Sequence, residues 1–431
     1  MKLLMGEVAA FLGASSGVPD RPVEGYSIDS RSLAPGQLFF AIRGPRFDGH
    51  QFTGQALGRG AAGAVVEEAF FAAAPPEWRP ALLAVADTRA ALQSLAHQVR
   101  RRWGKRLVAV TGSAGKSTTK EMIAAILSRR FHVWRSPGNL NNDFGLPLAL
   151  LGLEPEHEVA VVELAMSAAG EIARLARLAE PQVGVVTNVA AAHLQFFDSV
   201  DAIALAKREL IEYLASTGPG ALAVLNQDDE RVRRFAEGFP GRVATFGFLR
   251  EAAFHASEVR PGAGIGSVFH VTAPEWQAEF TLPLPGRYNI QNAMAAIAAS
   301  SAFAIPPEEM RKALADWPGA HRRIVVAGEM LELGPRSPEM HRGVGRHCAP
   351  NRVNWVIAVQ GDAKFIAEGA AVGGIPPSHR LFFPDSRSAG EFCRALIAPG
   401  DVILVKGSRA VHLETVVEML KERESGVRSQ E

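Results

Sequence analysis

Residues 108–127 read VAVTGSAGKSTTKEMIAAIL, and this stretch decides the fold. An apolar run ends at Thr111, a loop with Gly112 and Gly115 follows, and a helical pattern begins near Lys116. Glycines let backbone N–H groups approach phosphate oxygens closely, and the start of a helix adds a positive dipole. The stretch therefore predicts a strand, a phosphate-binding loop and a helix. The alternative is a glycine-rich turn in which GKS occurs by chance.

The loop is not a strict Walker A sequence, because Val110 stands where that pattern has its first glycine. Lys116 offers a point charge to a phosphate group, and the hydroxyl of Ser117 is placed to bind a magnesium ion. The residues predicted to contact the phosphates are Gly112, Ser113, Ala114, Gly115, Lys116, Ser117 and Thr118. A nucleoside triphosphate with Mg²⁺ is the ligand that this loop predicts.

Further apolar runs alternate with helical patterns in the middle of the chain. They are LVAVT, VAVVEL, VGVVTN and ALAVLN, at residues 107–111, 159–164, 183–188 and 221–226. Continuous apolar strands between helices are typical of a parallel sheet covered on both faces. The predicted class is therefore α/β, with a central, mostly parallel sheet.

At 431 residues the chain is too long for one compact core, and its composition suggests three domains. Residues 1–83 hold short strand-like runs separated by Gly and Pro. Residues 84–318 contain the phosphate loop, and residues 319–431 repeat the α/β rhythm.

Composition narrows the class of protein. The formal net charge of +1 gives no electrostatic reason to expect nucleic acid. The only cysteines, Cys348 and Cys393, are too few for a disulfide framework or a cysteine zinc site. Glu7 interrupts the apolar N-terminus, and no run reaches about 18 apolar residues. We expect a cytoplasmic monomer without a membrane span.

Two polar residues follow neighbouring strands of the predicted sheet. Glu163 lies at the end of VAVVEL, and His193 lies just past VGVVTN. Ligands of doubly wound sheets bind outside the carboxyl ends of strands, and carboxylates are natural magnesium ligands. Both residues are therefore candidate metal ligands, together with Ser117. The alternatives are that Glu163 is a surface glutamate and that His193 only makes hydrogen bonds within the protein.

The motifs TGSAGKSTTK, VELA, TNVAAAHL and ALAKRELI resemble the Mur ligase family, whose members add amino acids or dipeptides to the peptidoglycan precursor. The resemblance implies an ATP-dependent ligase that works through an acyl phosphate. It also implies that Lys207, fourteen positions after His193, is carbamylated and binds a second magnesium ion. Lys116, His193 and Lys207 are the implied catalytic residues. Without the resemblance, Lys207 would be taken for a solvated helix lysine.

The N-terminal block resembles the uridine-nucleotide domain of the same family. Its DSR element, Asp29, Ser30 and Arg31, would contact the UDP-sugar. The following RGPRFDGH element, residues 43–50, matches the family in Gly44, Asp48, Gly49 and His50. The implied substrate-binding residues here are Ser30, Arg31, Asp48, Gly49 and His50. A plain turn is the alternative.

The segment SPGNLNNDFGLPLALL, residues 136–151, narrows the substrate. It resembles family members that join UDP-N-acetylmuramoyl-tripeptide to D-alanyl-D-alanine, with Asn139, Asn141 and Asn142 facing the tripeptide. An asparagine-rich turn is the alternative. The DNPR element of ligases that add diaminopimelate as the third residue is absent.

The helix start GRYNIQNAMAA, residues 286–296, resembles the family segment whose asparagines hold the nucleotide base. Asn289 and Asn292 are three residues apart and so share one helix face. Tyr288 replaces the usual histidine. An N-capping role for Asn289 is the alternative.

The last domain departs from the family pattern. LADWPGAHRRIVVAGEMLELG, residues 314–334, runs directly into what the family has as a second strand, so that the first strand and helix of a Rossmann-like domain are missing. The family's ribose-contacting aspartate therefore has no counterpart. Rival expectations are a ligase that adds the third residue and a non-catalytic homologue that binds the UDP-precursor.

Overall fold

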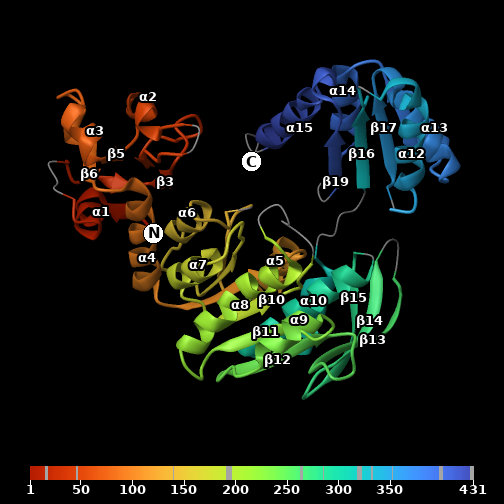
Figure 1. The fold of residues 1–431 in the computed structure, drawn as a ribbon, viewed down its shortest axis with the longest axis horizontal. Helices are drawn as coiled ribbons and strands as arrows, with labels where there is room; N and C mark the ends of the chain where they lie inside the picture. Colours follow the sequence, from red (N-terminus) through yellow and green to blue (C-terminus); the bar gives the residue numbers. More distant parts are fainter. Residues whose placement is uncertain are drawn as a thin grey trace. The chain divides into compact units, whose positions relative to one another are not determined.

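The structure is a computed structural model of the 431-residue chain. It describes residues 1–14, 18–44, 47–138, 140–190, 197–262, 266–284, 286–317, 323–331, 333–351, 353–397 and 401–427, with side chains as far as residue 421. The chain divides into two compact units, Met1–Trp317 and Pro318–Glu431 (Figure 1). Among the described residues, no helix has the length and apolar character that crossing a membrane requires.

The first unit begins with a small parallel sheet, drawn in red and orange in Figure 1. Its strands lie in the order β3 (Gly25–Ser27), β4 (Gln37–Phe40), β5 (Gly63–Glu67) and β6 (Leu82–Val85). Its helices are α1 (Met5–Leu12), α2 (Thr53–Gly58) and α3 (Glu68–Ala73). A two-residue pairing of β1 (Leu3–Leu4) with β2 (Pro22–Val23) holds the N-terminus beside this sheet.

The same unit contains a nine-stranded sheet in the order β15-β14-β13-β12-β11-β10-β7-β9-β8. Its parallel strands are β7 (Arg106–Thr111), β8 (Val133–Arg135), β9 (Val159–Glu163), β10 (Val183–Val186), β11 (Leu222–Asn226), β12 (Arg242–Gly247) and β13 (Phe254–Pro261). Antiparallel strands β14 (Ser267–Thr272) and β15 (Gln277–Leu282) complete it. The carboxyl ends of the parallel strands share one edge, where polar side chains from distant segments meet.

Helices cover both faces of this sheet. They are α4 (Thr88–Trp103), α5 (Lys116–Leu127), α6 (Gly145–Leu151), α7 (Glu171–Ala179), α8 (Val200–Ser216), α9 (Glu230–Arg233), α10 (Arg287–Ser300) and α11 (Pro307–Ala315). Alternate residues of a strand point to opposite faces. Leu107 and Ala109 accordingly belong to one core with residues of α4, α6, α7 and α8. Val108 and Val110 are also fully buried, outside that core.

Asp87 and Gly104 mark the two ends of helix α4. The side chain of Asp87 accepts hydrogen bonds from the backbone N–H groups of Arg89 and Ala90, at 2.7 and 3.0 Å. Gly104 ends the helix in the left-handed conformation, with φ of 66°. The cap places the first turn of α4, and with it Arg89, beside the loop that leads into α6.

The second unit contains a four-stranded parallel sheet, drawn in blue in Figure 1. Its order is β18 (Arg380–Phe383), β17 (Trp355–Val359), β16 (Arg323–Gly328) and β19 (Val402–Lys406). Its helices are α12 (Ser337–Cys348), α13 (Lys364–Val372), α14 (Ser386–Leu396) and α15 (Glu414–Val427). Cys348 packs with α13 on one face and Cys393 with α15 on the other.

The predicted α/β class with a mostly parallel central sheet is confirmed. The second unit also has the predicted shortened form, because the chain runs from the end of α11 at Ala315 to the start of β16 at Arg323. Residues 318–322 of that connection lie outside the described residues.

Candidate functional site

The phosphate loop connects β7 to α5, as its sequence predicts. Gly112 and Gly115 have φ values of 149° and 82°, which favour glycine. A side chain at Gly112 would overlap the hydroxyl of Thr187, and one at Gly115 would overlap the amide of Asn292. The two glycines therefore allow both the loop's conformation and the close approach of its neighbours.

Residues at the end of β10 hold the loop from the other side. The backbone N–H of Ser113 donates to Asn188 O at 2.9 Å, and that of Ala114 donates to Asn188 Oδ1 at 3.0 Å. The Thr187 hydroxyl donates to Ala114 O at 2.6 Å. These contacts within the chain fix the conformation of the loop. Sequence reasoning missed them, although Thr187 and Asn188 are the last two residues of the strand predicted at residues 183–188.

Glu163 links the phosphate loop to the segment at residues 136–151, called the asparagine segment below. The carboxylate stands at the end of β9 with only 2% of the residue exposed. Its Oε2 accepts from Ser117 Oγ at 2.6 Å, and its Oε1 accepts from Asn141 Nδ2 at 2.8 Å. Lys116 lies beside Ser117 in sequence, and its ammonium donates to Gly112 O at 3.1 Å.

The oxygens of Ser117 and Glu163 are hard donors of the kind that Mg²⁺ prefers, so they fit the predicted metal. The described residues contain no group of three His, Cys, Asp or Glu side chains arranged for a metal ion. The third predicted ligand, His193, falls within residues 191–196, outside the described residues.

Lys207 is buried in α8, with 2% of the residue exposed. Burial, and then the positive charge of Lys116, lowers the pKa of Lys207 to about 7. Its amine is therefore available in the neutral, nucleophilic form near neutral pH, which an exposed lysine is not. A lysine carbamate forms only from such an amine.

The three predicted asparagines have different surroundings. Asn141 holds Glu163, and its carbonyl accepts from Ala165 N at 2.8 Å. Just before α6, Asn142 Oδ1 accepts from Phe144 N and Gly145 N at 3.2 and 2.9 Å. Asn139 lies outside the described residues. In the described chain the side chain of Asn142 thus performs the turn chemistry that was the alternative reading of this segment.

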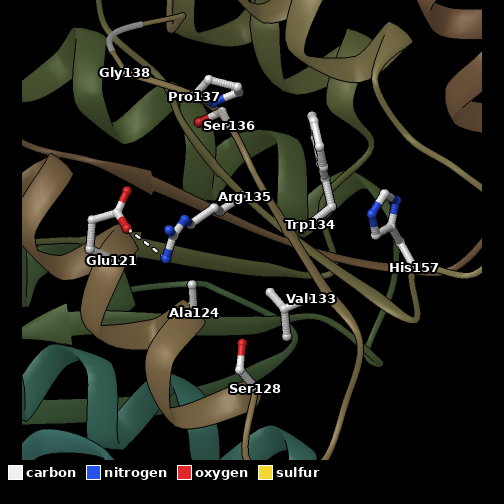
Figure 2. Close-up of a pocket in the computed structure, with 10 residues that line it drawn as sticks. All are labelled: Glu121, Ala124, Ser128, Val133, Trp134, Arg135, Ser136, Pro137, Gly138 and His157. Carbon is white, nitrogen blue, oxygen red and sulfur yellow. Dashed lines mark ion pairs between the residues drawn. The ribbon is translucent and has the colours of Figure 1, made fainter. Parts of the chain in front are cut away.

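A cavity of about 630 Å³ lies along the edge strand β8, next to the asparagine segment (Figure 2). Its lining includes Ser136, Pro137 and Gly138 at the start of that segment. The buried ammonium of Lys120 donates to Ser136 O at 2.6 Å and so fixes this start from behind. Glu121 and Arg135 form an ion pair of 3.1 Å at the cavity, visible in Figure 2.

The predicted base-binding helix start also lies at the phosphate loop. Asn292 is 8% exposed, and its Oδ1 accepts from Thr119 Oγ1 at 3.4 Å. Tyr288, one turn earlier, is 82% exposed. Asn289 is the third residue of α10, so it does not occupy the N-cap, which is Gly286.

Asp228 was missed by sequence reasoning and organises this region. Its carboxylate accepts from the backbone N–H groups of Phe248 and Leu249, each at 2.9 Å, and from Gln291 Nε2 at 2.9 Å. The guanidinium of Arg287 lies 3.8 Å from the ring centre of Phe248. Asp228 thereby ties the loop after β12 to α10. Its place two residues after the end of strand β11 was the available signal.

In the small sheet, His50 is 3% exposed and both ring nitrogens are engaged. Nε2 accepts from Glu67 N at 2.9 Å, so Nδ1 carries the proton and donates to Asp48 Oδ1 at 2.6 Å. A side chain at Gly49 would overlap the backbone of Ile42. Asp48, Gly49 and His50, which were predicted to bind substrate, therefore fix the turn of the chain between β4 and α2.

The DSR element presents a cation to solvent. The Ser30 hydroxyl is buried and donates to Gln55 Oε1 at 2.8 Å. Arg31 has an 82% exposed side chain, and its guanidinium makes two hydrogen bonds to Asp29, at 3.0 and 2.7 Å. This paired guanidinium lowers the pKa of Asp29 to about 2. Arg31 is the predicted residue of this element whose group is open to a ligand.

In the second unit, polar groups gather where β16 and β19 end. Glu329 Oε1 accepts from Asp362 N at 2.9 Å, and Ser408 N donates to Glu329 O at 3.1 Å. Ser408 Oγ in turn accepts from Leu331 N at 2.9 Å. The fully buried His341 accepts from Met330 N at 2.9 Å. These contacts make the loops after the two strands one connected structure.

Three family models match this chain. Residues 22–100 match the model of the Mur ligase family, catalytic domain, residues 110–300 the Mur ligase middle domain, and residues 286–409 the Mur ligase, glutamate ligase domain. A relative from Escherichia coli (strain K12), UDP-N-acetylmuramoyl-tripeptide–D-alanyl-D-alanine ligase, is 34% identical, with 94% of this chain and 95% of the relative covered.

Two solved structures are similar along nearly their whole length. UDP-N-acetylmuramoylalanyl-D-glutamyl-2,6-diaminopimelate–D-alanyl-D-alanyl ligase from Acinetobacter baumannii has a TM-score of 0.73 and 28% identity, covering 98% of this chain and 99% of that one. The MurF ligase of Thermotoga maritima in complex with ADP has a TM-score of 0.62 and 26% identity, covering 94% and 98%. The matching family models and the 34% identity to the E. coli relative show that this chain belongs to the Mur ligase family.

Proposed function

We propose that this chain uses ATP to join D-alanyl-D-alanine to UDP-N-acetylmuramoyl-tripeptide, giving the pentapeptide precursor of peptidoglycan. The observation that carries the proposal is the bridge at Glu163, which connects Ser117 of the phosphate loop to Asn141. Through this bridge, one carboxylate contacts both the predicted triphosphate site and the segment that is implied to face the tripeptide. The names of the E. coli and A. baumannii relatives support the same pair of substrates.

The reaction has two steps. A carboxylate oxygen of the tripeptide attacks the γ-phosphorus of ATP, ADP leaves, and an acyl phosphate remains. The free amine of D-alanyl-D-alanine then attacks the acyl carbon, loses a proton, and inorganic phosphate leaves as the amide forms. Both steps bring anionic groups together, so the protein contributes mainly by positioning them and offsetting charge.

Different residues of the site would bind the phosphates and the metal ion. Lys116 and the backbone N–H groups of its loop would bind the β- and γ-phosphates. Ser117, Glu163, His193 and the carbamate of Lys207 would hold Mg²⁺, which when bound neutralises charge on the phosphate oxygens. The carbamate forms when the neutral amine of Lys207 adds to CO₂ and loses a proton, which gives an anionic oxygen donor.

The three predicted domains have separate roles in this proposal. Residues 1–83 would bind the UDP-sugar, with Arg31 as the exposed cation, and residues 84–318 would bind ATP. Asn289 and Asn292 would contact the base. Residues 319–431 would bind the dipeptide, and the loops after β16 and β19 are the candidate contacts.

The test is release of phosphate from ATP with UDP-N-acetylmuramoyl-tripeptide and D-alanyl-D-alanine present, and with each omitted in turn. Turnover should require all three. Lys116→Ala should lower it by about 100-fold or more, since a charge-stabilising group is removed, with an unchanged circular dichroism spectrum. Turnover with a single amino acid in place of the dipeptide would support third-residue addition. Binding of the UDP-precursor without turnover would support a non-catalytic homologue.

A further inference from the structure

Two arginines from different helices converge on one buried carboxylate. Arg89, in the first turn of α4, and Arg174, in the first turn of α7, both donate from Nη2 to Asp143 Oδ2, the latter at 3.0 Å. Asp143 is 9% exposed and lies directly after Asn142, two residues before the start of α6. Its carbonyl accepts from Gln93 Nε2 at 3.1 Å, and Arg89 lies 5.0 Å from the ring centre of Phe144. The pair is therefore held in place by packing as well as by charge.

Each of the two guanidinium groups has N–H donors that do not bond to Asp143 and could bind a ligand. Their side chains are 46% and 47% exposed, and both contact the same oxygen of Asp143 through a single nitrogen. A guanidinium has five N–H donors in a planar fork that matches a carboxylate. The other oxygen, Asp143 Oδ1, is buried and has no hydrogen-bond partner among the described residues. The cluster thus has unused hydrogen-bonding capacity.

Glu171 is the other charged group at Arg174. Its Oε1 lies 3.9 Å from Arg174 Nη2, and its Oε2 accepts from the backbone N–H groups of Ser167 and Ala168 at 2.6 and 3.2 Å. With Asp143 it balances the two arginines. Because the charges of the cluster cancel, binding of an anionic ligand here would depend on directed hydrogen bonds more than on long-range electrostatic attraction.

The cluster lies next to the phosphoryl-transfer site. Asp143 is two residues from Asn141, which donates to Glu163, and two residues span at most about 7 Å. The first turn of α7 is connected to the site a second time. Glu209 of α8, two residues after Lys207, accepts from Gly170 N and Ala173 N at 2.6 and 2.9 Å. A peptide with one carboxylate at Glu163 would have its neighbouring groups within reach of the arginines.

The peptide substrate carries carboxylates that do not react. The name of the A. baumannii relative gives its peptide as alanyl-D-glutamyl-2,6-diaminopimelate. Glutamate and diaminopimelate are both diacids, so each keeps a free carboxylate when one is used in a bond. Resting on the proposed function, we propose that Arg89 and Arg174 bind a non-reacting carboxylate of the UDP-linked tripeptide, with Asp143 as the positioning residue that holds both guanidinium groups.

The test compares Arg89→Ala and Arg174→Ala with the full-length wild-type protein in steady-state assays. Each substitution should raise the KM for the UDP-tripeptide by about 10- to 100-fold, as expected for a lost charge-assisted hydrogen bond. The KM values for ATP and for D-alanyl-D-alanine should stay within about twofold, since those sites are not touched. Arg177→Ala is the matched control, because Arg177 is an exposed arginine one turn further along α7.

Substrate variants identify the carboxylate and need no mutation. Wild-type protein is assayed with tripeptides ending in diaminopimelate or in lysine, and with one whose free glutamyl carboxyl is an amide. A raised KM for the amide, with equal effects of the arginine substitutions on both tripeptides, assigns the glutamyl carboxylate. Effects confined to the diaminopimelate peptide assign its distal carboxylate.

The two proposals fail differently. Wild-type protein that turns over none of these tripeptides contradicts the proposed function. Wild-type turnover with KM values that neither the arginine substitutions nor the substrate changes alter by more than about twofold overturns the carboxylate site alone. If Arg174→Ala does not fold, Arg174→Lys and the amide substrate decide the same question.

Discussion

Ser117 Oγ donates a 2.6 Å hydrogen bond to Glu163 Oε2, across 46 residues of sequence. The bond joins the first turn of α5, a helix that covers the nine-stranded sheet, to the end of β9, a strand of that sheet. It brings a hydroxyl and a carboxylate oxygen together beside the loop that would bind a triphosphate. A cation that binds both oxygens would take the place of the hydrogen bond between them.

Glu163→Gln should lower kcat by about 100-fold or more and raise the Mg²⁺ concentration needed for half-maximal rate, because a neutral amide is a weaker ligand for a hard cation. The measurement is phosphate release against Mg²⁺ concentration. Glu156→Gln, at an exposed glutamate shortly before β9, is the control and should leave both values unchanged. An unaltered Mg²⁺ dependence in Glu163→Gln would remove this residue from the metal site.

Lys207 should make stability depend on pH. Its folded-state pKa is about 7, below the ordinary value of 10.5, so between these values the unfolded chain binds more protons than the folded one. Burial of the ammonium therefore opposes folding fully below pH 7, and this cost disappears as the pH rises to 10.5. The slope should approach 1.4 kcal/mol per pH unit. Lys207→Met should remove it, which urea unfolding at several pH values would show in carbonate-free buffer.

Lys207→Ala should also abolish ligation, and short carboxylates such as acetate should restore part of it if an anionic oxygen is what the site needs. Rescue would be measured as phosphate release against carboxylate concentration, with chloride as the control salt. Full activity of Lys207→Ala without any added carboxylate would rule out the carbamate.

His50→Ala should destabilise the first unit by about 2 kcal/mol, because Asp48 and the backbone N–H of Glu67 both lose a partly buried hydrogen-bond partner. The change would be measured by thermal unfolding. Arg31→Ala should leave stability unchanged, since its side chain is 82% exposed, and weaken binding of the UDP-precursor. The opposite pattern would make His50 a ligand-binding residue and Arg31 a structural one.

Gly115→Ala should abolish ATP binding, because the added methyl group meets Asn292 and has to displace the loop or the start of α10. Gly218→Ala is the control, since Gly218 has a φ of 101° but open space around it. Both substitutions carry a backbone cost of about 1–2 kcal/mol. Calorimetry with an ATP analogue should separate them. Equal affinities in the two variants would show that contact with Asn292 is unimportant.

The sequence by itself determined the local elements. Apolar runs of strand length gave β7, β9, β10 and β11, and the glycines of the phosphate loop placed the start of α5 at Lys116. Asp87 and Gly104 marked the ends of α4. These features are readable because they depend on neighbouring residues: side-chain periodicity, glycine conformations and helix caps act over a few positions. The family motifs added the roles of residues that local chemistry leaves ambiguous, Lys207 above all.

Only the tertiary structure decided which polar groups meet. Asn141 contacts Glu163, whereas the side chain of Asn142 accepts from the backbone just before α6, although the two are adjacent in one motif. Arg89 and Arg174 reach Asp143 from 54 and 31 residues away. His50, in a motif implied to bind substrate, has both ring nitrogens engaged within the chain. Such pairings depend on how sheet order and helix packing bring distant segments together, and composition or spacing along the chain does not encode that geometry.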